Sequence, residues 1–144
     1  MKKYNFRLET VRRVQRMREE IAKNDLARAN SGVRRAESVV ADRLAAYEAK
    51  TALRSGAQST SAFLQGRSFD QLSGNSLLAA RAAKVVAEHE ATLKAQAWTH
   101  AAREVKALDR LDERKREEYR IEFDRDQDAV VDDIVVARAR RGES

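Results

Sequence analysis

The stretch that decides the fold is AKNDLARANSGVRRAESVVADRLAAY, residues 22–47. Its apolar side chains recur in steps of three and four residues, which is the spacing of a coiled-coil seam. They are Ala22, Leu26, Ala29, Val33, Ala36, Val40, Leu44 and Tyr47. The series extends toward the N-terminus through Val11, Val14, Met17 and Ile21. We therefore predict one long helix over residues 7–54.

The composition also favours long helices over a compact globular core. The chain has 144 residues, of which 36% are charged and only 6% aromatic, and it contains no proline. Cysteine is absent, which excludes disulfides and thiolate metal sites. No apolar run approaches the ~20 residues that a membrane-spanning helix needs. We expect a cytoplasmic protein with no direct membrane insertion.

A change of composition separates this helix from a second one. The stretch RSGAQSTSAFLQGRSFDQLSGNS, residues 54–76, is rich in glycine and serine, so we expect a turn region over residues 55–76, with a short helical turn capped by Ser59 or Ser61. A second helix is predicted over residues 77–140. Its expected apolar stripe consists of Leu77, Leu78, Ala82, Val85, Val86, His89, Leu93, Ala97, Ala101, Val105, Leu108 and Leu111. The predicted fold class is all-α, a single antiparallel coiled-coil hairpin.

Charge supports the antiparallel direction. Residues 2–18 hold seven basic residues and one acidic residue, whereas residues 109–133 hold six basic and eleven acidic residues. Folding back in the turn region brings these two segments together, and their opposite charges select this pairing. Each exposed ion pair contributes only ~0–1 kcal/mol, so charge sets the register more than the stability.

The sequence lacks the patterns of catalytic and metal sites. It contains no glycine-rich phosphate loop or dinucleotide fingerprint. His89 and His100 are too far apart along one helix to share a metal ion. The paired carboxylates near residues 112 and 117 are surrounded by arginines at helical spacing, which indicates a solvated, ion-paired face. We expect no enzyme activity, no cofactor and no metal.

The formal net charge of +6 raises the alternative of nucleic-acid binding. Two observations argue against nucleic-acid binding. The charge of the basic N-terminal residues is partly balanced by acidic residues of the same chain, and aromatic side chains are not interleaved with them as stacking platforms. We therefore expect no nucleic-acid partner.

Three segments carry a resemblance to a known family. The start KKYNFRLETVRRVQRMREEIAKNDLARA, residues 2–29, and the late segments KALDRLDERKREEYR and VVDDIVVARARR, residues 106–120 and 130–141, resemble the flagellar export protein FliJ. The resemblance implies a non-catalytic component of the flagellar type III export apparatus, similar to the stalk subunit of rotary ATPases. It implies insertion into the export ATPase hexamer, promotion of ring assembly, contact with the membrane export gate and escort of chaperones. Such a protein is expected at the cytoplasmic face of the inner membrane when assembled.

The expected ring-binding residues are exposed charges of the two terminal segments. They are Arg12, Arg13, Arg16, Arg114, Lys115, Arg116 and Arg120. The alternative for each is that it only keeps the protein soluble.

A second expected binding surface, for the export gate or a chaperone, lies near the turn. Its residues are Tyr47, Phe63, Leu64, Phe69, Leu72 and Leu77. Two helices offer little surface to bury them all, although the turn region could itself cover them. We expect a monomeric hairpin. The competing interpretations are a generic structural coiled-coil adaptor and the equivalent stalk protein of a virulence-type secretion system.

Overall fold

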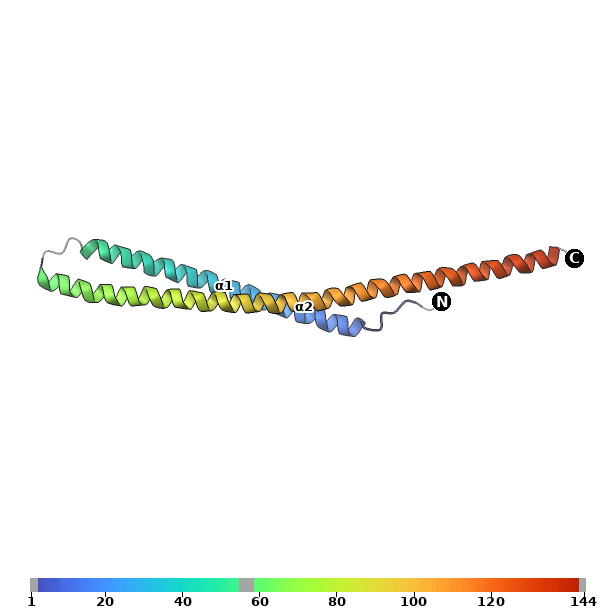
Figure 1. Cartoon of the computed structure of the whole chain (residues 1–144), viewed down its shortest axis with the longest axis horizontal. Helices are drawn as coiled ribbons and strands as arrows, with labels where there is room; N and C mark the ends of the chain where they lie inside the picture. The colour runs from blue at the N-terminus through green and yellow to red at the C-terminus, as the bar shows by residue number, and fades with distance from the viewer. Residues whose placement is uncertain (1–2, 55–58, 143–144) are drawn as a thin grey trace. The chain divides into compact units, whose positions relative to one another are not determined.

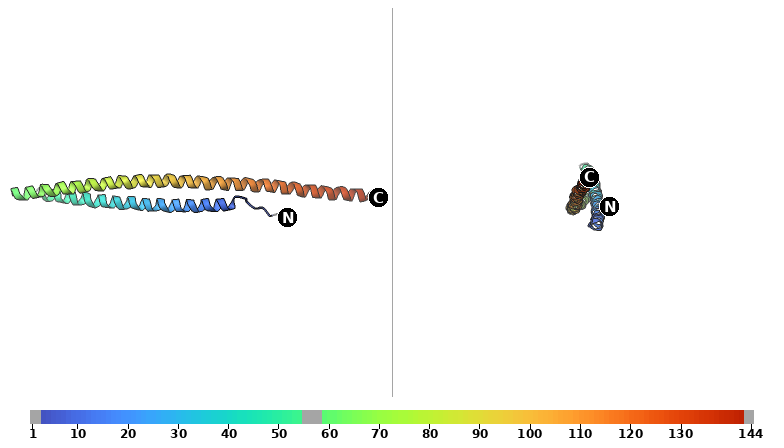
Figure 2. Two further views of the ribbon diagram at one scale, coloured as in Figure 1. Left: turned by 90° about the horizontal axis from the view of Figure 1, so that it is seen from below. Right: turned by 90° about the vertical axis from the view of Figure 1, so that its right-hand side faces the viewer.

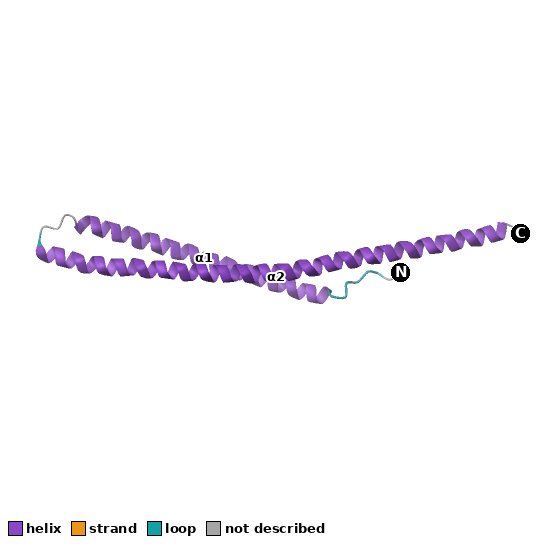
Figure 3. Cartoon of the chain, in the orientation of Figure 1, coloured by secondary structure: helices purple, strands orange, loops and turns teal. Residues whose placement is uncertain are grey.

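The computed structural model describes residues 3–54 and 59–142, and these residues form two helices (Figures 1 and 3). Helix α1 spans Glu9–Arg54 and helix α2 spans Thr60–Gly142. No strand occurs in the described residues. The predicted all-α antiparallel hairpin is confirmed. The hairpin divides into a middle unit, residues 18–100, and a terminal unit, residues 1–17 and 101–144, which are described separately below.

Helix α2 begins far earlier than the sequence predicted. Ser59 caps it, because the backbone N–H of Ala62 donates to Ser59 Oγ (3.2 Å) and that of Phe63 donates to the Ser59 carbonyl (2.9 Å). The predicted turn region, residues 55–76, is therefore wrong over residues 60–76, while residues 55–58 lie outside the described part of the chain. Gly66 and Gly74 do not end the helix, since each takes up ordinary helical backbone geometry.

The α1 seam of the middle unit is confirmed. All eight predicted seam residues from Ala22 to Tyr47 are half-buried, and their intervening neighbours are mostly exposed. Figure 2 shows this part of α1 running beside the green-to-yellow part of α2. Lys50 Nζ donates to Ser73 Oγ (2.9 Å), and Lys84 Nζ lies 3.9 Å from Glu37 Oε1. In these pairs the residue number on α2 rises as the residue number on α1 falls, so the two helices run antiparallel.

The predicted α2 stripe of the middle unit is wrong after its first residue. Leu77 is buried, but its neighbour Leu78 is exposed, as are Ala82, Val85, Val86, His89, Leu93 and Ala97. The residues that face α1 are instead Ser73, Leu77, Ala80, Lys84, Ala87, Ala91, Lys94, Ala95 and Trp98. Small side chains let the helices approach closely, and the two lysines lay their apolar stems along the seam while their charged ends reach outward.

The seam of the terminal unit is partly polar. On α2, Val105 is buried and Ala101, Leu108 and Leu111 are half-buried, as predicted. On the N-terminal side the inward residues are Phe6, Leu8, Arg12 and Gln15. The predicted upstream series is wrong, because Val11, Val14, Met17 and Ile21 are exposed.

Replacing Gly32 by alanine is expected to raise the free energy of unfolding by about 0.5–1 kcal/mol, because glycine is a poor residue for a helix interior. A Cβ atom at Gly32 would meet nothing within 4 Å. Gly74→Ala is the matched variant, since its Cβ would lie 3.8 Å from Tyr47 Cε2, an ordinary contact. Urea unfolding followed by circular dichroism measures both, and a loss of stability in Gly32→Ala would contradict the helix packing described here.

Candidate interaction surfaces

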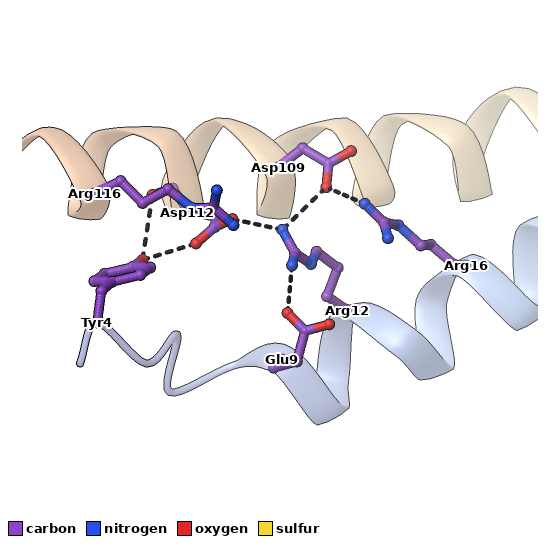
Figure 4. A network of polar contacts seen from close by, with 7 residues as sticks. All are labelled: Tyr4, Glu9, Arg12, Arg16, Asp109, Asp112 and Arg116. Carbon is purple, nitrogen blue, oxygen red and sulfur yellow. Dashed lines mark hydrogen bonds and ion pairs between the residues drawn. The ribbon is translucent and has the colours of Figure 1, made fainter.

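A polar network joins the N-terminal segment, residues 3–17, to α2 within the terminal unit. We name this network the N-terminal clasp (Figure 4). Its centre is the Asp112 carboxylate, whose side chain is only 4% exposed. Tyr4 Oη donates to Asp112 Oδ1 (2.7 Å), and Arg12 Nη1 donates to Asp112 Oδ2 (2.7 Å). Arg116 Nη2 lies 2.9 Å from the same Oδ2 atom. One buried carboxylate thus binds three side chains, two of which come from the N-terminal segment.

Arg12 is the main N-terminal member of the clasp. Its guanidinium pairs with Glu9, lies 3.6 Å from Asp109 Oδ1, and stacks over the Phe6 ring at 5.2 Å from the centroid. The Arg12 side chain is only 11% exposed. Arginine suits this place because its planar, weakly hydrated guanidinium can stack on an aromatic ring and donate several hydrogen bonds at once.

Two further contacts flank Arg12. Arg16 Nη2 donates to Asp109 Oδ1 (3.0 Å), and the Arg116 guanidinium lies 5.6 Å from the Tyr4 ring centroid. The expected attraction between basic N-terminal and acidic C-terminal segments is therefore confirmed at Asp109 and Asp112. It does not extend to the acidic residues from Asp124 to Asp133, which are exposed and form no ion pair in the described chain.

The clasp changes the acidity of its members. Burial by itself raises the pKa of Asp112, but the hydrogen bonds from Tyr4, Arg12 and Arg116 outweigh it and hold that pKa below its usual range. Burial and the hydrogen bond to Asp112 raise the pKa of Tyr4. The hydrogen bond to Asp112 also raises the pKa of Arg12, although burial opposes it. The network is thus suited to an ionised aspartate, a neutral tyrosine and charged arginines.

We expect the clasp to be strongest between about pH 4 and pH 10. Asp112 has a lower pKa in the folded chain than the ~3.9 of the unfolded chain. Its contribution to the free energy of unfolding is therefore present above that value and is lost as the pH falls through the folded pKa. Tyr4 has a folded pKa above ~10, so its contribution is present below pH ~10 and is lost as the pH rises through the folded pKa. Thermal unfolding of the unmodified chain and of Asp112→Asn at pH 3, 7 and 10.5 measures this. The difference between the two proteins should be largest at pH 7, and a constant difference would contradict the assignment.

The seven expected ring-binding residues occupy different environments. Arg12 points inward to the clasp, whereas Arg16 and Arg116 also contribute to the clasp but stay more than half exposed. Lys115 pairs with Glu118 (2.6 Å) and Arg120 with Glu117 (3.6 Å), both on the surface of α2. Arg13 and Arg114 are exposed and form no ion pair within residues 3–54 and 59–142.

The six residues expected near the turn also divide. Phe63, Leu64, Phe69 and Leu72 are exposed on the first turns of α2. Tyr47 is half-buried beside Gly74, and Leu77 is buried in the seam, so neither offers a free face. The Lys50 ammonium lies 5.7 Å from the Phe69 ring centroid.

Sequence reasoning missed a further exposed apolar face on α2. Its largest members are Leu78, Val85, Val86 and Leu93. Their helical spacing predicts that they lie in the seam, but spacing alone does not say which of two stripes on a helix packs against the partner helix.

The described residues give no metal site and no membrane span. Among residues 3–54 and 59–142, no three histidine, cysteine or acidic side chains are grouped so that they could hold a metal ion. Within the same ranges, neither helix contains a stretch apolar and long enough to cross a bilayer.

A comparison with known protein families supplies the context for these surfaces. The sequence model of the family described as "Flagellar FliJ protein" matches residues 3–144, essentially the full chain. Searches of curated proteins and of solved structures find no match. The match covers both helices and the whole N-terminal clasp. The chain therefore belongs to the flagellar FliJ protein family, whose members are components of the flagellar type III export apparatus.

Proposed function

We propose that this protein is the non-catalytic stalk of the flagellar export ATPase, with the terminal unit as the part that enters the ATPase ring. The N-terminal clasp supports this proposal, because it holds the N-terminal segment against α2, while Arg13 and Arg114 beside it are exposed. Of the seven expected residues, Arg13 and Arg114 are the exposed ones that form no ion pair within the described chain, so they are the members of this set most available to acidic groups of the ring.

A single hairpin inside a ring of six identical subunits contacts those subunits unequally. A ligand that binds one conformation of a subunit better than another shifts that subunit toward the favoured conformation. Unequal contacts around the ring therefore couple stalk binding to subunit conformation and to ring assembly. No catalytic group on the stalk is needed for this effect.

The test measures the ATP hydrolysis rate and the hexamer fraction of the export ATPase with and without this protein. We expect both to rise, and we expect the double variant Arg13→Glu, Arg114→Glu to need about tenfold more protein for the same effect. The matched control is Arg35→Glu, Arg81→Glu, which reverses two exposed arginines of the middle unit. No change in either quantity at saturating protein would refute the proposal.

The second part of the proposal concerns the export gate and the export chaperones. We propose that Phe63, Leu64, Phe69 and Leu72 form the docking surface for one of these partners at the cytoplasmic face of the inner membrane. Aromatic residues are enriched at protein–protein interfaces, and Phe63 and Phe69 are both more than half exposed.

Substituting Phe63 and Phe69 by serine tests this surface. Both rings are exposed, so helicity measured by circular dichroism should stay unchanged while capture of the purified gate domain or chaperone falls by about tenfold or more. Val39→Ser removes an exposed apolar residue of α1 and serves as the control. Unchanged capture of both the gate and the chaperones by the double variant would rule out this surface.

A further inference from the structure

The last part of α2 is a helix without a partner in the described chain. We name residues 124–142 the C-terminal segment. Contacts of the N-terminal segment on α2 reach Tyr119, whose ring lies 5.6 Å from that of Tyr4 and 6.4 Å from that of Phe123. After Phe123, every residue from Asp124 to Gly142 is exposed. Figure 1 shows this segment of the terminal unit, in red, running on past the N-terminal residues.

One side of the C-terminal segment is apolar. Val130, Val131, Ile134 and Val135 follow one another at i, i+1, i+4 and i+5, which places them on a single helix face. All four side chains are exposed. An amphipathic helix gains most of its stability by burying such a face, so this stripe favours association.

The charges of the same region are sorted by sign along the helix. Residues 122–133 hold six acidic residues and one arginine, whereas residues 134–142 hold three arginines and no acidic residue. Within the described chain, none of the charged residues from Asp124 onward forms an ion pair. Parallel pairing of two such segments would place like charges together, and antiparallel pairing places opposite charges together.

We propose that the C-terminal segment binds the same segment of a second copy of this chain, in antiparallel orientation. With the two-fold axis beside Asp132 and Asp133, Val130 of one copy faces Val135 of the other, and Val131 faces Ile134. The same axis places Asp124 of one copy level with Arg141 of the other, and it brings the acidic half with Asp128 alongside the basic half with Arg138. These side chains lie on the same side of the helix as the stripe or at its edge. The stripe and the charges therefore specify one register.

Self-pairing fits this segment better than pairing with an unrelated acidic or basic helix. A two-fold contact must be self-complementary, so each copy has to supply both halves of every pair. Residues 124–142 do so, since the acidic half and the basic half flank a stripe that reads almost the same in both directions. A partner of one charge sign would match only half of the segment. The proposal concerns the free protein and does not depend on the proposed role in the export apparatus.

Charge reversal in two complementary variants tests the proposal. One variant carries Arg138→Glu, Arg140→Glu and Arg141→Glu, and the other carries Asp124→Lys, Asp126→Lys and Asp128→Lys. Sedimentation equilibrium over a range of concentrations should show a monomer–dimer equilibrium for the full, unmodified chain. Each variant alone should raise the dissociation constant by about tenfold or more, and an equimolar mixture of the two should recover dimers.

The mixture makes the test independent of any local loss of helix in one variant, because recovery requires the reversed charges to face each other. Arg103→Glu, Lys106→Glu, Arg110→Glu is the control, since it changes the net charge equally on an exposed part of α2 outside the segment. The proposal fails if the unmodified chain stays monomeric at every concentration. It also fails if dimers persist in both variants, which would point to another face such as that of Leu78 and Val85.

Discussion

Replacing Leu77 by alanine is expected to lower the free energy of unfolding by about 2–3 kcal/mol, whereas the same change at Leu78 is expected to alter it by less than about 0.5 kcal/mol. The two leucines are adjacent, yet Leu77 is 7% exposed and Leu78 is 62% exposed. Truncation of the buried side chain removes apolar contacts in the seam and leaves a cavity. Truncation of the exposed one removes neither.

Urea unfolding followed by the fluorescence of Trp98 measures this difference. Trp98 is the single tryptophan and lies half-buried in the seam of the middle unit, as does Leu77. Leu77 and Leu78 are matched in chemistry and sequence position, so each is the control for the other. A larger loss in the Leu78 variant than in the Leu77 variant would mean that the other stripe of α2, with Leu78, Val85 and Leu93, faces α1.

Replacing Asp112 by alanine is expected to release the N-terminal segment from α2. The change removes the acceptor for Tyr4, Arg12 and Arg116 together and leaves the poorly exposed Arg12 guanidinium without its nearest partner on α2. Amide hydrogens in the first turns of α1, Glu9 to Arg16, should exchange about tenfold faster or more, because local opening becomes easier. Hydrogen exchange followed by mass spectrometry of N-terminal peptides measures this.

Glu113→Ala is the matched control for Asp112→Ala. Glu113 is the next carboxylate along α2, but it is exposed and has no ion pair in the described chain. Its removal should leave exchange at the N-terminus unchanged. Exchange that is equally slow in the Asp112 variant would show that Phe6 and Leu8 hold the segment by apolar contact alone.

The sequence was sufficient for the fold class, the helix pair and the α1 seam, because the apolar spacing from Ala22 to Tyr47 has a single interpretation. It failed where two interpretations compete. Helix α2 has one face of large apolar residues, including Leu78 and Val85, and another of alanine and lysine. Counting hydrophobic side chains selects the first, but α1 packs on the second, where small residues permit close approach.

The clasp was only partly predictable for a related reason. Charge balance pointed to contact between the basic N-terminus and the acidic part of α2, and Arg12 pairs there with Asp109 and Asp112. Nothing in the charge pattern distinguishes a buried aspartate from the exposed Glu113 beside it. Tyr4 was not expected at the site, since a lone tyrosine before a helix has no periodicity that would reveal its partner. The early start of α2 was missed because serine and glycine were weighted as breakers, although Ser59 acts as the cap.

The polar seam of the terminal unit makes its cohesion sensitive to ionic strength. The Debye length falls from ~10 Å at 0.1 M salt to ~3 Å at 1 M, so the exposed Arg16–Asp109 pair weakens in sodium chloride more than the buried pair between Arg12 and Asp112. The alanine and leucine contacts of the middle unit depend instead on hydration, which sulfate strengthens. Chloride and sulfate at equal ionic strength should therefore act differently on the two units. The choice of salt can then weaken the contacts of the terminal unit while those of the middle unit are kept.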